Sequence, residues 1–78
     1  MPIFYFHLRT KDGIEMDDIG IELENAESAY LAACAAIPGI SIELVRRKSS
    51  PLQYAFQVSN AEGHVYWEVP FGEALHLK

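Results

Sequence analysis

The side chains best suited to chemistry in this sequence are His7, Asp17, His64 and Glu68. Imidazole and carboxylate groups are common zinc ligands, and they also act as general acids and bases. A zinc site, however, needs three or four ligands that converge at about 2 Å. These four residues come from two separate predicted hairpins and include no closely spaced ligand pair. We therefore expect no metal ligand and no catalytic residue, and we favour a non-enzymatic role over an enzyme.

Other short motifs lead to the same expectation. Asp17-Asp18-Ile19-Gly20 lacks the ligand spacing of a calcium loop, and Ser49-Ser50 has no histidine or acid at a suggestive distance in the sequence. The glycines are isolated, so no phosphate-binding loop is present, and the single cysteine, Cys34, cannot form an internal disulfide. We expect no cofactor.

Length and charge narrow the class further. The chain has 78 residues, which predicts a single domain over residues 1–78. Its formal net charge of −5 argues against nucleic acid as a partner, because backbone binding depends on Lys and Arg neutralising phosphates. No run of 18 apolar residues predicts a membrane span, and Met1-Pro2-Ile3 lacks the opening of a signal peptide. We therefore expect an acidic, cytoplasmic protein without a membrane partner.

The elements that must position these side chains centre on a helix over residues 26–48. Its apolar stripe is spaced by alternating steps of four and three, at Ala26, Tyr30, Ala33, Ile37, Ile40 and Leu44. Asn25 suits the N-cap, and Arg46, Arg47 and Lys48 suit the C-terminal end of the helix dipole. Pro38-Gly39 interrupts the stripe without changing its phase, which predicts a kinked helix or two nearly coaxial pieces. The alternative is a strand over residues 40–45.

The first predicted hairpin follows from alternating residue types between positions 3 and 17. Phe4, Phe6 and Leu8 would face the core, and Tyr5, His7 and Arg9 the opposite side. A loop at residues 11–13 would place Leu8 opposite Met16, Thr10 opposite Ile14, Arg9 opposite Glu15 and His7 opposite Asp17.

A second hairpin is predicted around Asn60-Ala61-Glu62-Gly63, after a short extended segment at residues 21–23 and the helix. With this loop Val58 would face Val65, Phe56 would face Trp67 and Tyr54 would face Val69, all on the core side. Pro70 would end the last strand, and a helical turn would follow over residues 71–75. The sequence therefore predicts an α+β fold in ββαββ order, with a small antiparallel sheet of two hairpins and the helix packed on one face.

The helix-free face of this sheet is the candidate interaction surface. Its predicted members are Tyr5, His7, Arg9, Gln57, His64, Tyr66 and Glu68, with Glu15, Asp17 and Ser59 beside them. Tyrosine, arginine and histidine are common at protein contacts, so we expect this face to bind another protein or a second copy of the chain. The alternatives are a small metal-binding protein, or a protein that holds an apolar ligand between the helix and the sheet edge. The residues do not indicate which small molecule such a groove would take.

Several pieces together resemble a family of short bacterial proteins classed as a domain of unknown function. They are Tyr5-Phe6-His7-Leu8-Arg9, Asp17-Asp18 with Gly20-Ile21-Glu22-Leu23, the alanine-rich helix, Asn60-Ala61-Glu62-Gly63 and Val69-Pro70-Phe71. The resemblance spans most of the chain, and Pro38-Gly39 departs from it. It implies no substrate, cofactor or catalytic residue.

Overall fold

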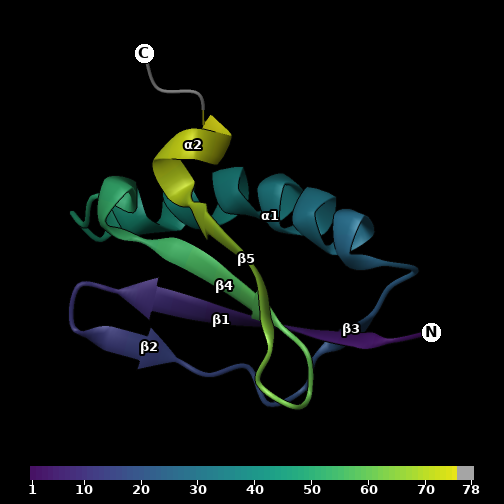
Figure 1. Cartoon of the computed structure of the whole chain (residues 1–78). Helices are drawn as coiled ribbons and strands as arrows, with labels where there is room; N and C mark the ends of the chain where they lie inside the picture. Colours follow the sequence, from purple (N-terminus) through teal and green to yellow (C-terminus); the bar gives the residue numbers. More distant parts are fainter. Residues whose placement is uncertain (76–78) are drawn as a thin grey trace.

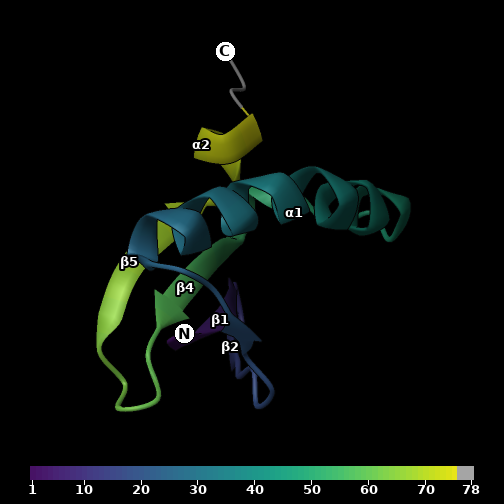
Figure 2. The same ribbon diagram turned by 90° about the vertical axis from the view of Figure 1, so that its right-hand side faces the viewer.

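The computed structural model describes residues 1–75 as one antiparallel sheet with a long helix across one face (Figures 1 and 2). Two short helical segments follow the long helix, one before and one after the second hairpin. The elements in chain order are β1 Ile3–Thr10, β2 Gly13–Glu15, β3 Ile21–Glu22, α1 Ala26–Arg46, the 3₁₀ turn η1 Pro51–Gln53, β4 Ala55–Ser59, β5 Val65–Pro70 and α2 Phe71–Leu75. The predicted α+β class and element order are confirmed.

The two hairpins meet through β1 and β4, which lie side by side at the centre of the sheet (Figure 1). The strand order is β2-β1-β4-β5, and β3 pairs with the start of β1. In the central pair, Phe6 lies opposite Val58 and His7 opposite Gln57. This pairing places side chains from the two ends of the chain next to each other, and the sequence pattern alone did not predict it.

The helix α1 begins as predicted and continues through Pro38. The side-chain oxygen of Asn25 accepts a hydrogen bond from the backbone N–H of Ser28 at 2.8 Å, which caps the N-terminus. Pro38 lies within one continuous helix that curves over the sheet (Figure 2). The alternative of a strand over residues 40–45 is therefore wrong, and the helix ends at Arg46 rather than at Lys48.

By length and composition, α1 resembles a membrane-spanning helix. In this structure 28% of its most apolar window is buried, and the buried stripe packs on the sheet. Its buried positions are Ala29, Ala33, Ile37, Ser41 and Leu44. The predicted positions Ala26, Tyr30 and Ile40 pack partly buried at the side of this stripe.

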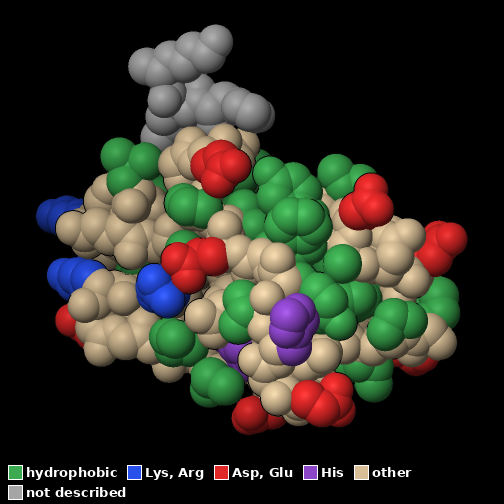
Figure 3. Space-filling model, viewed as in Figure 1, with side chains coloured by type: hydrophobic (Ala, Val, Ile, Leu, Met, Phe, Trp, Pro, Cys, Tyr) green, Lys and Arg blue, Asp and Glu red, His purple; other side chains and the backbone are tan. Residues whose placement is uncertain are grey.

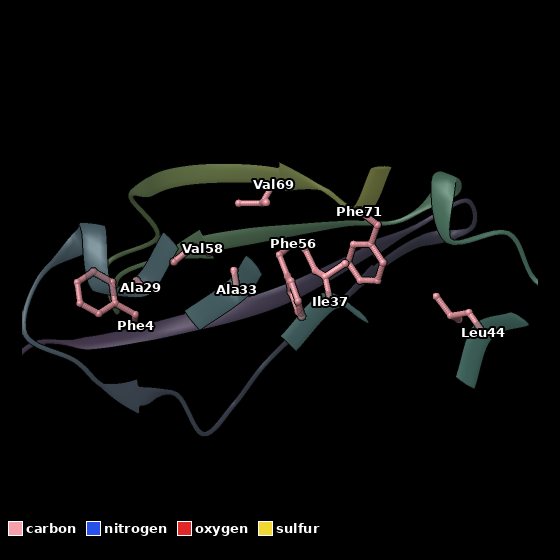
Figure 4. Close-up of a cluster of buried hydrophobic side chains, with 9 residues drawn as sticks. All are labelled: Phe4, Ala29, Ala33, Ile37, Leu44, Phe56, Val58, Val69 and Phe71. Carbon is pink, nitrogen blue, oxygen red and sulfur yellow. The ribbon is translucent and has the colours of Figure 1, made fainter. Parts of the chain in front are cut away.

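The core lies between α1 and the sheet. Figure 4 shows Phe56, Ile37 and Phe71 packed together, with Ala33 beside them and Ala29 near Phe4 and Val58 further along the same core. Burying apolar area of this kind is the main favourable contribution to folding. Phe71 is fully buried at the start of α2, which explains why this short helix closes one end of the core.

The register of the first hairpin differs from the prediction by one residue. The loop contains two residues, so Leu8 pairs with Glu15, Arg9 with Ile14 and Thr10 with Gly13. The Thr10 side chain tightens the loop, because its hydroxyl accepts a hydrogen bond from the N–H of Asp12 and donates one to the carbonyl of Gly13. All three residues of β2 are exposed. Burial of one face therefore does not determine the pairing register of this strand.

The register of the second hairpin differs by two residues and contains a bulge. Phe56 pairs with Val69 and Val58 with Trp67, whereas Ser59 pairs with Val65. One step along β4, from Val58 to Ser59, therefore corresponds to two steps along β5, from Trp67 to Val65. Tyr66 is the extra residue of this bulge. Because the register shifts by an even number, Phe56, Val58 and Val69 stay on the core side, as predicted. The bulge exchanges the two faces for the residues of β5 that precede Trp67.

Candidate functional site

The structure brings five of the predicted surface residues together on the helix-free face. His7, Gln57 and Glu68 form one row across β1, β4 and β5. Arg9 reaches across β4 to Glu68 with both guanidinium nitrogens, at 3.1 Å to Oε2 and 3.0 Å to Oε1. Tyr5 stacks on the His7 ring with centroids 6.3 Å apart. The predicted juxtaposition of these side chains is therefore present.

Tyr66 and His64 depart from the predicted face. The Tyr66 ring packs edge-on against Phe4, a core residue, with centroids 5.5 Å apart. His64 packs against Tyr66 in turn, with centroids 4.7 Å apart. The cause is the β5 bulge, which places Val65 opposite Ser59 and turns Tyr66 toward Phe4.

His7 lies on the predicted face, but the chain covers it. Only 7% of its surface is exposed, because the segment between β2 and β3 folds over the ring. Its Nε2 lies 3.0 Å from the Ser59 hydroxyl, and its Nδ1 accepts a hydrogen bond from the backbone N–H of Asp17 at 2.9 Å. The predicted cross-strand pairing of His7 with Asp17 is wrong, because β2 ends at Glu15, but Asp17 still contacts His7 through its backbone N–H.

The Asp17 carboxylate fills the gap that β2 and β3 leave along β1. It accepts hydrogen bonds from the backbone N–H groups of Phe6 at 3.0 Å, Ile19 at 3.0 Å and Gly20 at 3.2 Å. Burial acts to raise the pKa of Asp17, but these three amides and the nearby His7 together hold the pKa below its usual value. Asp17 therefore fixes the β2–β3 segment to β1 as an ionised acceptor.

Ser59, His7 and Asp17 resemble a catalytic triad in composition but not in hydrogen bonding. In a triad the histidine takes the serine proton at one ring nitrogen while the other donates to a carboxylate. Here Nδ1 is an acceptor from an amide, so the neutral ring carries its hydrogen on Nε2 and donates it to Ser59. Ser59 is also only 2% exposed. This cluster has no base for the serine hydroxyl, and it serves to hold the loop in place.

The helix-free face carries apolar residues that the sequence prediction assigned elsewhere. Ile14 lies opposite Arg9, and Val65 lies opposite Ser59, so both share the side of His7. Met16 borders the same hollow as Tyr5 and His7. The exposed fractions are 43% for Ile14, 65% for Met16 and 43% for Val65. A two-residue hairpin loop at Lys11-Asp12 would have revealed Ile14, whereas the bulge has no clear sequence signal.

The structure also contains an apolar groove away from the sheet. It lies where the second half of α1 meets η1 and the end of α2, and has a volume of about 590 Å³. No group of three or more His, Cys, Asp or Glu side chains is placed to hold a metal ion within residues 1–75. Figure 3 shows hydrophobic side chains spread between the charged ones on the side of the molecule seen in Figure 1.

Comparison with known proteins identifies a family without an assigned activity. Neither the curated proteins nor the solved structures give a match. One family model matches residues 3–72, which is nearly the whole described chain from β1 into α2, and it is named Domain of unknown function (DUF6894). Because the match includes both hairpins and α1, the chain belongs to the DUF6894 family.

Proposed function

We propose that the protein is a non-catalytic interaction module that binds a protein partner through the helix-free face of its sheet. The observation that carries this proposal is the exposure of Ile14, Met16 and Val65 on the face that also presents Tyr5. A strand face turned to water usually carries polar side chains, so apolar groups here indicate a contact surface.

The face is also held rigid before any partner arrives. His7 donates a hydrogen bond to Ser59 and accepts one from the backbone N–H of Asp17, and these two bonds fix the β2–β3 segment against the central strands. A surface ordered in advance loses less conformational entropy on binding. The exposed Arg9–Glu68 pair supplies polar groups beside the apolar ones, as at the rim of an ordinary protein interface.

The test replaces exposed apolar side chains that are not part of the hydrophobic core. Ile14→Lys with Val65→Lys puts charge on the face at two exposed positions, and Leu31→Lys is the matched control on exposed α1 surface. Sedimentation of the wild type over a concentration series measures self-association, and NMR chemical-shift mapping locates contacts with a partner purified from cells. We expect the double variant to weaken the contact by tenfold or more, at about 1.4 kcal/mol per factor of ten, and the control to leave it unchanged.

Two results together would contradict the proposal. A wild-type protein that stays monomeric, together with partner-induced shifts confined to α1, would place the contact elsewhere. Tyr66→Ala is unsuitable here, because Tyr66 packs on Phe4 and its loss would disturb the core.

A further inference from the structure

The groove between α1, η1 and α2 is lined mostly by apolar side chains, with Ser41, Arg46 and Ser50 as its polar members. Three of the apolar side chains are largely exposed, namely Ile42 at 58%, Val45 at 61% and Leu52 at 61%. The apolar lining residues are Pro38, Ile42, Val45, Pro51, Leu52 and Leu75. A volume of about 590 Å³ lies within the range of small-molecule sites, roughly 300–1,000 Å³.

The outer surface of α1 beside this groove is unusual for a helix in contact with water. No charged residue occurs between Glu27 and Glu43, so the exposed surface of α1 carries charge only near its two ends, with apolar side chains such as Leu31 and Ile42 between. Packing on the sheet covers only the stripe that faces the core. The apolar character of the opposite side therefore needs a separate explanation.

A polar side chain beneath the groove lacks a partner. Ser41 is 6% exposed, and its hydroxyl makes no hydrogen bond to any residue that the structure describes. A buried hydroxyl left without a partner costs about 1–3 kcal/mol. The Ser41 oxygen lies beneath the groove lining, so this hydroxyl offers no contact to a ligand in the groove.

The charge at the groove is positive. Arg46 is the charged side chain among the lining residues, and Arg47 and Lys48 follow it at the end of α1. Figure 3 shows Lys and Arg side chains at this end of the molecule, where α1 ends and β1 turns into β2. Arg46 pairs with Glu43 at 3.1 Å, and because this pair is exposed on both sides and contributes little, Glu43 is a weak competitor for an anionic ligand.

From the volume of the groove, its apolar lining and the basic end of α1, we propose that the groove binds a single-chain fatty carboxylate. The acyl chain lies along Ile42, Val45 and Leu52, and the carboxylate accepts hydrogen bonds from Arg46. From Pro38 to Arg46 the helix offers a length of roughly 12 Å at 1.5 Å per residue, which suits a chain of medium length. The site shares no residue with the helix-free face, so it stands or falls independently of the proposed interaction module.

The experiment compares two amphiphiles of opposite charge and equal chain length. Decanoate and decyltrimethylammonium are titrated into the full-length protein, purified free of lipid, below their micelle concentrations. Calorimetry gives the affinities, and amide chemical shifts locate the site. We expect decanoate to change the amide chemical shifts of residues 38–46 and 50–52. We expect the cation to bind at least about tenfold more weakly, which corresponds to the loss of one moderate ion pair.

Matched variants separate the parts of the site. Arg46→Gln is expected to remove the preference for the anion while keeping chain binding, whereas Ile42→Glu is expected to remove binding of decanoate altogether. Leu31→Gln, on exposed α1 surface outside the groove, is the control that keeps both. Because all three positions are exposed, the variants are expected to fold, and far-UV circular dichroism checks this.

Three results would overturn the proposal. One is equal affinity for the two amphiphiles, which removes the role of Arg46. Another is a set of shifts outside the groove residues. The third is binding that begins only at the micelle concentration, which would show that the protein contacts an aggregate or a bilayer rather than one molecule.

Discussion

At the scale of single residues, the centre of the molecule's polar chemistry is His7. Its two ring nitrogens contact Ser59 from one hairpin and the Asp17 backbone from the other, and the residue is almost fully buried. Replacing His7 by Phe keeps an aromatic ring but leaves both partners without a hydrogen bond. We expect His7→Phe to lower the free energy of unfolding by about 1–3 kcal/mol, measured by urea denaturation.

A double-mutant cycle checks that this cost comes from the hydrogen bond to Ser59. Ser59→Ala alone leaves the His7 donor without a partner, so it is also expected to destabilise the protein. The double variant should then cost less than the sum of the two single changes. Simple additivity would show that the two side chains act independently, in conflict with their 3.0 Å contact.

The Asp17 carboxylate makes stability depend on pH in the acidic range. Its folded-state pKa is lowered from 3.8, so the stabilisation is fully present above about pH 5 and is lost as the pH falls through the folded pKa. Asp17→Asn cannot titrate and is expected to show a shallower loss of stability on acidification below pH 4. Thermal unfolding between pH 2.5 and pH 6 measures this difference. Parallel curves for the two proteins would contradict it.

At the scale of elements, the sequence correctly predicted which side chains face the core wherever one side of the helix or strand is buried. The stripe of α1 and the Phe4, Phe6, Phe56 and Val58 positions were predictable because each has one side against the core. Trp67 was also correctly placed: its ring lies 5.1 Å from that of Tyr30, and its Nε1 donates to the Ala26 carbonyl at 2.8 Å. Patterning therefore predicted the fold class and element order.

The errors in strand register occur in segments whose side chains are exposed on both faces or whose pairing is interrupted by a bulge. β2 is exposed throughout, so the choice between a two-residue and a three-residue loop was left to the Thr10 hydroxyl. The β5 bulge follows from the tight Asn60 loop, where one side-chain oxygen accepts from the N–H groups of both Glu62 and His64. These local contacts decided which way Ile14, Val65 and Tyr66 point, and therefore changed part of the candidate surface.

The helix α1 provides a prediction at the same scale. Pro38 is exposed in its interior and cannot donate a hydrogen bond to the carbonyl of residue 34. Pro38→Ala restores that donor, at a gain of about 3 kcal/mol in helix propensity less the ~1 kcal/mol by which proline restricts the unfolded chain. We expect the variant to be more stable by about 2 kcal/mol in urea denaturation. A loss of stability would show that the curve of α1 is needed for its packing on the sheet.

At the scale of the whole molecule, the two proposed surfaces belong to separate parts of the fold. One is the helix-free face of the sheet, and the other lies on the opposite side, beside α1, η1 and α2. Independent sites should respond independently. Ile14→Lys is expected to leave decanoate affinity unchanged, and Ile42→Glu to leave any protein contact of the sheet unchanged. Calorimetry and sedimentation on both variants measure this, and a cross effect would indicate that one surface serves both roles.

The outer strand of the sheet has a consequence for behaviour at high concentration. Within residues 1–75, β5 has no strand on its far side, yet the extra residue at Tyr66 interrupts its ladder near the start and Pro70 withholds an amide at its end. An irregular edge of this kind is a poor template for the addition of further strands. The same feature that moved Tyr66 off the predicted surface thus disfavours amyloid-like stacking at this edge.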